Sequence, residues 1–338
     1  DSDQVMFYKE QKDGQILEEG INEAGSFSSW IAAATSYSTT GIQTIPFYIF
    51  YSMFGFQRIG DLAWAAGDSR ARGFLLGATA GRTTLNGEGL QHEDGHSHLI
   101  SATIPNCVSY DPCFAYELAV IIQNGLERMI QNQEDVYYYI TVMNENYQHP
   151  EMPKNIEKNI IQGIYKFSES KLKSPKVQLM GSGVILREVI EAAKMLESEW
   201  SIAADIYSVT SFTELRREAL DGERWNMLNP DKKQKVSIIQ GIISDKESPI
   251  VASTDYMKSY AEQIANFIPN KFVSLGTDGY GRSDSREALR SFFEVDRYYI
   301  VIAALKALVD SKKVDIDILT KAIKKYKMNN NKPNPVSI

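Results

Sequence analysis

The 338-residue sequence has few cysteines and no surplus of positive charge. Its two cysteines, Cys107 and Cys113, predict free thiols in a reducing compartment such as the cytoplasm, and they exclude a scaffold built on disulfides. Lys and Arg number 36 against 43 Asp and Glu, giving a net charge of −7, so the chain has no excess cation to neutralise a phosphate backbone. We therefore expect no nucleic-acid partner.

Long apolar runs are also absent. The longest clearly apolar stretch, Tyr298 to Leu305, ends at Lys306 and is far shorter than the ~20 residues that cross a bilayer. A signal peptide would begin with a basic region followed by an apolar region, and a natural start would carry an initiator Met. The first residues, Asp1 to Gln4, have none of these features. We therefore expect no membrane partner, and we expect the chain to be a piece of a longer one.

The composition that is present favours a folded α/β protein. A hydrophobic content of 43% can fill buried cores in about two domains, which excludes a disordered or collagen-like chain. No internal repeat is visible. The stretch from His149 to Lys176 is rich in Lys, Glu and Pro and predicts a linker. We accordingly expect one domain over residues 1–152 and a second over residues 153–338.

Strand-like and helix-like segments alternate in both halves, which predicts two open, mainly parallel sheets flanked by helices. In the first half, strands are predicted at Ile45–Tyr51, Phe74–Thr79, Thr103–Ser109 and Val136–Val142, with helices at Ile16–Ala33, Gly60–Arg72 and Phe114–Asn132. In the second half, strands are predicted at Lys176–Met180, Ala204–Val209, Ile250–Ser253 and Lys271–Leu275, with helices at Val184–Trp200, Lys258–Phe267, Tyr298–Val309 and Ile316–Tyr326. The last ten residues, Asn329–Ile338, predict an extended arm.

A glycine turn between a strand and a helix, Gly181-Ser-Gly183, is one candidate nucleotide site. Asp205 follows at a distance where a ribose-binding acid would be sought. The third glycine of that fingerprint is missing, however, and Asp205 lies near the beginning of its predicted strand rather than at the end. An ordinary tight turn is therefore the favoured interpretation.

The segment Gln91–His98 contains three of the four histidines and two acids within eight residues. Its imidazoles at His92, His96 and His98 could bind a transition metal, although the glycines around them impose no fixed ligand geometry. A solvated loop is a second alternative. Titratable imidazoles beside carboxylates suit proton transfer and recognition of an anionic substrate, so we favour a polar active-site loop.

Two further segments lie upstream. Glu18, Glu19 and Glu23 offer carboxylates at a predicted helix entry, where a solvated helix face is the simpler explanation. The stretch from Phe47 to Arg58 holds six aromatic residues, more than one strand can bury on one face, so one or two of them are expected to line a pocket.

Taken together, four segments resemble the homodimeric bacterial pyruvate dehydrogenases, thiamine-dependent first components of the pyruvate dehydrogenase complex in the transketolase superfamily. They are Glu19–Glu23, Phe47–Gly55, Arg82–His98 and Gly276–Arg286. The resemblance implies an α/β fold made of part of a pyrimidine-binding domain and a transketolase-like C-terminal domain. The implied reaction decarboxylates pyruvate on thiamine diphosphate and then reductively acetylates lipoyl groups of the dihydrolipoyl acetyltransferase partner.

The same resemblance implies roles for individual residues. Glu23 matches the glutamate that hydrogen-bonds the aminopyrimidine ring, where an acid promotes proton transfer from the thiazolium carbon. Ile21 resembles a hydrophobic support beneath the cofactor, and Tyr51 and Phe54 resemble aromatic residues around the pyrimidine, with Arg58 nearby. His92 corresponds to a histidine facing the substrate. His98 is a second candidate for that side of the site.

One departure from the family pattern is informative. The Gly-Asp-Gly motif that binds diphosphate and Mg²⁺, followed about thirty residues later by Asn, has no counterpart here, and Asp278-Gly279 lacks that continuation. No metal ligand is therefore assigned, and the diphosphate and Mg²⁺ ligands are expected in an N-terminal portion that must join this chain. Thr277, Asp278, Arg282 and Asp284 are read as loop and interface structure. The alternative is that this chain alone is a non-catalytic dimerisation or interaction fragment.

Overall fold

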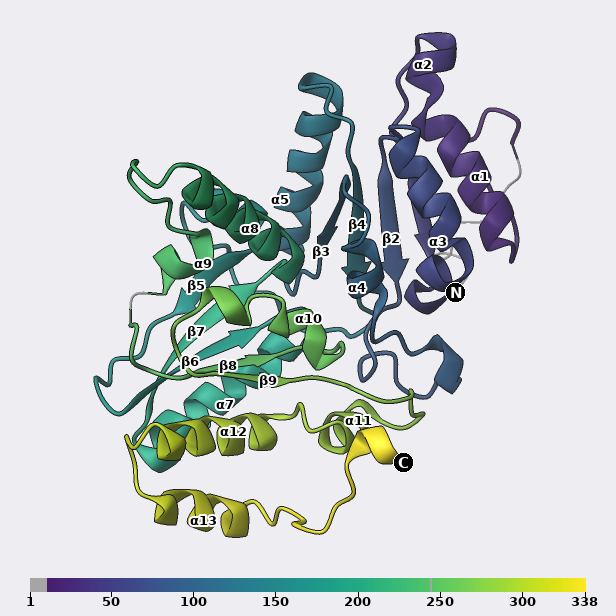
Figure 1. Cartoon of the computed structure of the whole chain (residues 1–338). Coiled ribbons are helices and arrows are strands. Elements are labelled where there is room, and N and C mark those ends of the chain that lie inside the picture. The colour runs from purple at the N-terminus through teal and green to yellow at the C-terminus, as the bar shows by residue number, and fades with distance from the viewer. Residues whose placement is uncertain (1–10, 244) are drawn as a thin grey trace.

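The computed structural model describes residues 11–243 and 245–338, so the N-terminal residues considered above lie outside the described residues. Within the described residues two separate sheets are flanked by helices, and the first half of the chain builds one sheet while the second half builds the other (Figure 1). The predicted α/β class with two open, mainly parallel sheets is confirmed. No helix in the described ranges is long and apolar enough to cross a membrane.

The first sheet has the strand order β1-β2-β4-β3, and all of its strands are parallel. Its strands are β1 (Phe47–Phe50), β2 (Phe74–Ala78), β3 (Cys107–Tyr110) and β4 (Tyr137–Val142). Its helices are α1 (Glu23–Ala34), α2 (Ser36–Thr40), α3 (Ser52–Asp68), α4 (Ser97–Ser101) and α5 (Ala115–Leu126), which continues as a π-helical turn at Glu127–Gln131. Each strand predicted here is present, with bounds shifted by a few residues.

Helix α1 begins at Glu23 rather than at the predicted Ile16. Gly20 adopts a φ of +68°, which breaks any helix before it, and the side chain of Asn22 accepts a hydrogen bond from the Gly25 amide at 3.1 Å. This cap fixes the helix start. Glu23 therefore occupies the first turn, where the helix dipole favours a carboxylate.

The second sheet has the order β5-β7-β6-β8-β9, with β5 antiparallel at one edge and the other strands parallel. Its strands are β5 (Ile164–Ser168), β6 (Lys176–Gly181), β7 (Ala203–Val209), β8 (Ile250–Ser253) and β9 (Phe272–Leu275). The helices are α6 (Glu157–Gln162), α7 (Ile185–Trp200), α8 (Phe212–Leu228), α9 (Ile238–Ile242), α10 (Lys258–Glu262), α11 (Arg286–Phe292), α12 (Arg297–Asp310) and α13 (Ile316–Lys325). Helices α7 and α12 cover one face of this sheet, and their apolar side chains pack into the same core as those of β6, β7 and β8.

Two predictions about connecting segments are wrong. The expected linker His149–Lys176 contains helix α6 and strand β5, and Ile160, Ile164 and Tyr165 are buried because β5 pairs with β7. The expected C-terminal arm ends in a 3₁₀ turn at Pro335–Ser337 rather than remaining extended. It lies against the protein, with the Lys332 ammonium donating to the carbonyl oxygen of Ser291 at 2.7 Å.

Both cysteines are free and buried in the core. Burial raises the pKa of the Cys107 thiol to about 12 and raises that of Cys113 well above its usual value. Thiolate is the reactive form of cysteine, so neither side chain is set up as a nucleophile.

Candidate functional site

Three segments meet beyond the carboxyl ends of the parallel strands β1 and β2. Strand β1 ends at Phe50 and the chain turns into α3 at Tyr51, while the long loop after β2 contains a 3₁₀ turn at Leu90–His92. Helix α1 lies beside α3 (Figure 1). Ligand sites in open α/β sheets occur at this edge, because loops from neighbouring strands converge there.

An ion pair joins α1 to α3 at this place. The Arg58 guanidinium donates to the Glu23 carboxylate, with 2.6 Å between Nη1 and Oε1. Only 18% of the Glu23 side chain is exposed, against 50% for Arg58. The guanidinium also lies 4.1 Å from the ring centroid of Phe54. A mostly buried carboxylate is thus held next to an aromatic ring by a cation that can move into solvent.

Aromatic rings extend the cluster toward the histidine loop. The His92 ring lies 4.9 Å from Phe54 and 5.3 Å from Tyr51, measured between centroids. Its Nδ1 is buried without a hydrogen-bond partner among the described residues. Because a buried polar atom is rarely left unpaired, this nitrogen is available for a ligand.

Two of the residues implied by the family resemblance lie elsewhere. Ile21 is 99% exposed in the turn before α1 and supports nothing in the described structure. His98 is buried under the loop, where its Nε2 is 3.0 Å from the Thr141 hydroxyl and its ring stacks on Tyr260 at 4.7 Å. The residues that the structure does bring together are Glu23, Arg58, Phe54, Tyr51 and His92.

Burial of His98 has a consequence for stability. It lowers the pKa of His98 to about 3, against the opposing field of Asp94. An unfolded chain binds the same proton with a pKa of about 6.5. Since the pKa is lower in the folded state, the stability that the neutral ring contributes is fully present above about pH 6.5 and is lost as the pH falls toward 3.

We expect the variant His98→Gln to lose less stability on acidification than the wild type. Between pH 7 and pH 5 the wild type should lose about 2 kcal/mol more than the variant, because only its buried ring must resist protonation. Urea unfolding of both proteins at the two pH values measures the difference. The carboxyl groups are the same in both proteins, so their effect cancels when the two changes in stability are subtracted. If the stability of both proteins changes with pH in the same way, the burial of His98 does not cause the loss on acidification.

Asp94 anchors the loop that carries His92. Its carboxylate is completely buried and accepts hydrogen bonds from the hydroxyls of Ser52 and Ser97 and from the amides of His96 and Ser97, the latter at 2.9 and 3.0 Å. Burial alone would raise its pKa, but these hydrogen bonds outweigh burial and lower it. The loop is thereby tied to Ser52 in the first turn of α3, two residues before Phe54.

The histidine loop is also fixed from the other half of the chain. Arg82 is buried and donates to the carbonyl oxygens of Thr277 and Gly279, and the Arg282 amide donates to the Glu93 carboxylate at 2.5 Å. Burial is the main cause that raises the pKa of Glu93 to about 7. The segment that holds Thr277 and Arg282, which was expected to be loop and interface structure, therefore contacts the side chains of Arg82 and Glu93, at the start of the histidine loop and next to His92.

The side chain of Asp111 packs against the glycine turn Gly181-Ser-Gly183. A Cβ on Gly183 would lie 2.6 Å from the Asp111 carboxylate, which leaves no space there for a ligand phosphate. Asp205 is buried at the start of β7 and pairs with Lys176 at 3.1 Å. The ordinary-turn interpretation therefore fits the structure better than a dinucleotide site. Across residues 11–243 and 245–338, no group of three or more His, Cys, Asp and Glu side chains could hold a metal ion.

The fold is shared with transketolases of known structure. A transketolase from Campylobacter jejuni superposes with a TM-score of 0.60 at 15% identity, covering 82% of this chain and 38% of that one. An inactive β4 tetramer of a split-gene transketolase gives a TM-score of 0.58 at 17% identity, covering 86% of this chain and 83% of that one. At these identities the likeness concerns the fold alone.

Sequence comparison identifies the family. Residues 1–150 match the pyruvate dehydrogenase E1 component middle domain, and residues 163–296 match the transketolase-like C-terminal domain. The chain is 62% identical to the pyruvate dehydrogenase E1 component of Pseudomonas aeruginosa over 338 residues and 58% identical to that of Escherichia coli K12 over 337 residues. The chain therefore belongs to the bacterial pyruvate dehydrogenase E1 family. It spans 38% of the length of these relatives, which cover 99% of it.

Proposed function

We propose that this chain supplies the aminopyrimidine side of the thiamine diphosphate site in an acetyl-transferring pyruvate dehydrogenase. The whole enzyme decarboxylates pyruvate and reductively acetylates lipoyl groups on the acyltransferase partner. The observation that carries the proposal is the cluster of Glu23, Tyr51, Phe54 and His92 beyond β1 and β2, in a chain of this family. When bound, the cofactor supplies a stabilised carbanion for decarboxylation.

The residues present fit an aminopyrimidine ring. The ring is flat and carries nitrogens, so it needs aromatic faces and a carboxylate partner, which Tyr51, Phe54 and Glu23 provide. The Glu23 carboxylate is paired with Arg58. For a ligand to bind, Arg58 would have to release one of the two carboxylate oxygens. The half-exposed side chain of Arg58 can do this without leaving a buried cation unpaired.

The chain's own residues then have separable tasks. Glu23 holds a proton at the ring nitrogen, in a place where burial strengthens that hydrogen bond. Tyr51 and Phe54 exclude water from the same ring. His92 has a buried nitrogen that lacks a partner among the described residues, and its ring faces both aromatic rings, which suits a contact to an anionic substrate such as pyruvate.

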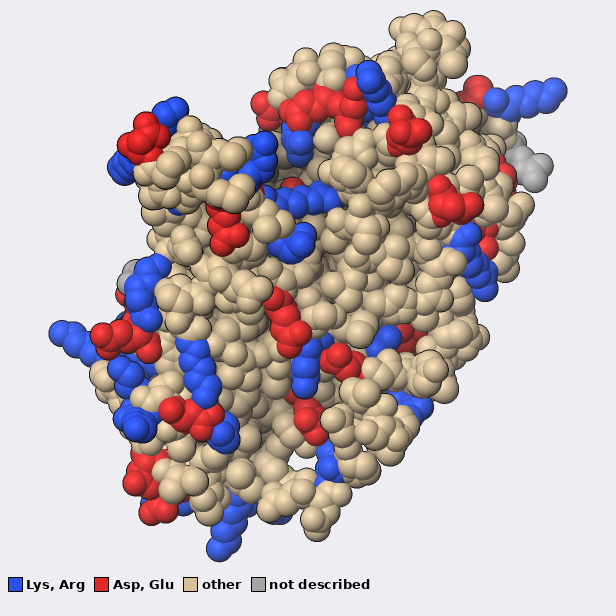
Figure 2. Space-filling model, viewed as in Figure 1, with Lys and Arg blue, Asp and Glu red and all other residues tan. Residues whose placement is uncertain are grey.

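The remaining half of the site is assigned to other chain segments. We place the diphosphate and Mg²⁺ ligands in the N-terminal portion of the enzyme and the complete site in a homodimer. Apolar side chains that line the free edge of the first sheet support such an assembly, since Phe47 and Ile49 of edge strand β1 are exposed. Figure 2 shows few charged side chains over the neighbouring region of α3 and α4. The alternative is that the chain alone is a non-catalytic dimerisation or interaction fragment, since its sequence has no counterpart of the motif that binds diphosphate and Mg²⁺.

Calorimetric titration tests this division of the site. We expect the chain alone to show no saturable binding of thiamine diphosphate and Mg²⁺ below about 1 mM, because it lacks the groups that hold the diphosphate. Binding at micromolar concentration should appear after the N-terminal portion is added. Tight binding by the chain alone would mean that the diphosphate is held by residues of this chain, and no binding after reconstitution would contradict the proposed cofactor.

A further inference from the structure

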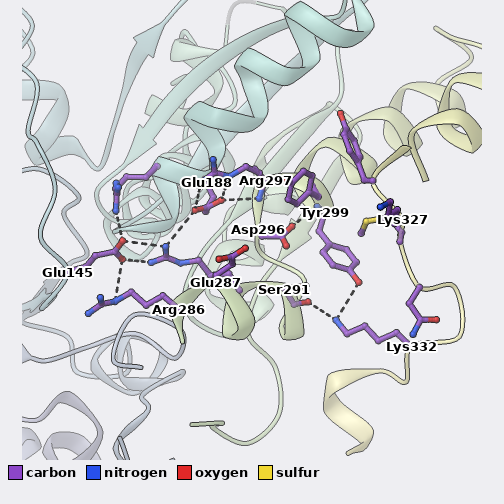
Figure 3. Close-up of a pocket in the computed structure, with 16 residues that line it drawn as sticks. Glu145, Glu188, Arg286, Glu287, Ser291, Asp296, Arg297, Tyr299, Lys327 and Lys332 are labelled. Atoms are coloured by element: carbon purple, nitrogen blue, oxygen red, sulfur yellow. Dashed lines mark hydrogen bonds and ion pairs between the residues drawn. The ribbon is translucent and has the colours of Figure 1, made fainter. Parts of the chain in front are cut away.

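A cavity of about 730 Å³ lies in the C-terminal half, between helices α7, α11 and α12 and the segment that follows α13. Figure 3 shows Glu145 and Arg286 at one end and Lys327 and Lys332 at the other, with Asp296 and Tyr299 between them. In Figure 2 an opening is visible at the place where Figure 1 shows the C-terminal segment passing beside α11 and α12. None of the lining residues belongs to the cluster around Glu23 and His92.

The cavity is positively charged although the whole chain is negative. The basic lining residues are Arg187, Arg286, Arg290, Arg297, Lys327 and Lys332, and the acidic ones are Glu145, Glu188, Glu287 and Asp296. Six basic and four acidic side chains line the cavity, and Glu294 outside the lining pairs with Lys332 at 3.3 Å, in a protein whose net charge is −7. A local surplus of this sign attracts anions.

Two glutamates orient the arginines instead of neutralising the whole cavity. Glu145 accepts from Arg187 at 2.5 Å and from Arg290, and the attraction of these cations lowers its pKa despite the opposing effect of burial. Glu188 accepts from Arg297 at 2.9 Å. Arg297 donates to Glu188 through both Nε and Nη2, and Arg290 contacts the two glutamates through Nη1 and Nη2. Among the described residues, the donors left over are therefore Nε of Arg290 and the nitrogens of Arg187 other than Nη1.

Unused donors remain at both ends of the cavity. Arg290 is only 6% exposed, and its Nε has no hydrogen-bond partner among the described residues. At the opposite end, the exposed Lys327 ammonium takes part in no ion pair or side-chain hydrogen bond within the described part of the chain. Fixed guanidinium groups at one end and a free ammonium at the other can contact two separate anionic groups of one molecule.

We propose that this cavity is a binding site for a small polyanion that carries at least two phosphate or carboxylate groups. Arginine forks recognise both groups by paired hydrogen bonds, and Lys327 adds a mobile charge for the second group. The site does not depend on the thiamine diphosphate site for its argument, because it shares no residue with it.

The test is calorimetric titration of the 338-residue chain with tripolyphosphate and, separately, with citrate. Lys327→Gln and Arg187→Gln should each weaken binding by about tenfold or more, since each removes one charge-assisted hydrogen bond. Lys321→Gln is the matched control, because it makes the same charge change on α13 outside the cavity, and it should weaken binding less than about twofold.

The two anions distinguish the chemistry of the ligand. Binding of tripolyphosphate alone assigns phosphate groups, binding of citrate alone assigns carboxylates, and either result supports the site if Lys327 and Arg187 are required. The proposal fails if neither anion binds at up to about 5 mM, or if the cavity variants bind as tightly as Lys321→Gln. Circular dichroism checks the folding of each variant, and the exposed Lys327 makes no contact that folding requires.

Discussion

Replacement of Glu23 by alanine in the full-length enzyme should lower the rate of pyruvate-dependent acetyl transfer by about 10²–10⁴-fold, the usual contribution of a positioned acid or base. The side chain is 18% exposed, lies in the first turn of α1 and, within the described part of the chain, forms an ion pair with Arg58. In the function proposed above, this carboxylate holds a proton at the bound ring. The measurement is the steady-state rate at saturating cofactor and pyruvate.

Glu18→Ala provides the matched control. Glu18 lies five residues earlier and is exposed, so its loss should leave the rate within about twofold of the wild type. Thermal unfolding should change little in either variant, because Arg58 is half exposed and ion pairs with a solvent-exposed partner contribute about 0–1 kcal/mol. Equal, small losses of activity in the two variants would return Glu23 to the solvated helix face that its spacing alone suggested.

The central parallel strands, such as β4 and β6, could be predicted from sequence because they are buried on both faces. Strand β4 reads Tyr137–Val142 without a charged residue, and strand β6 ends at a glycine turn that leads into the amphipathic helix α7. Continuous apolar runs bounded by turns are typical of such strands. Their order in the sheets requires long-range pairing and could not be derived from these local patterns.

The expected linker failed for a related reason. Strand β5 is an edge strand whose buried residues, Ile164 and Tyr165, adjoin Lys166 and lie between stretches rich in Lys and Pro. Edge strands carry charged residues and few apolar ones, so the amino-acid composition of an edge strand resembles that of a loop between two elements. The glycine at position 163 was the available sequence signal for the end of α6, since helices often end at a glycine. In the structure it caps the helix with a φ of +100°, and strand β5 follows directly.

Within the candidate site, the sequence indicated the segments but not their mutual contacts. The loop Gln91–His98 stood out by its density of histidines, yet nothing local distinguished His92, which faces the aromatic rings, from His98, which is buried. Burial of His98 depends on Tyr256 and Tyr260, which lie about 160 residues later in the chain. Polar residues such as Asp94 and Asp255 carry no periodic signal, so their buried hydrogen bonds become visible only in the structure.

Arg82→Met should lower the free energy of unfolding by about 3–5 kcal/mol, the cost of removing one partner from a buried ionic network. Arg82 is 4% exposed and donates to Thr277 and Gly279, and its charge faces Asp94, Asp255 and Glu93. Burial lowers its pKa, while these carboxylates act in the opposite direction. Methionine preserves the volume of the stem but leaves the carboxylates without their cation, so the contacts between the two halves weaken together.

Urea unfolding at pH 7 measures this loss, with Arg70→Met as the control. Arg70 is 72% exposed and lies 3.7 Å from Asp135, so its removal should cost less than about 0.5 kcal/mol. The loss in Arg82→Met should shrink at lower pH, because Glu93, with a pKa of about 7, becomes neutral and no longer needs the cation. A loss as small as that of Arg70→Met would mean that the histidine loop keeps its place without Arg82, and that its position depends instead on the hydrogen bonds of Asp94 to Ser52 and Ser97.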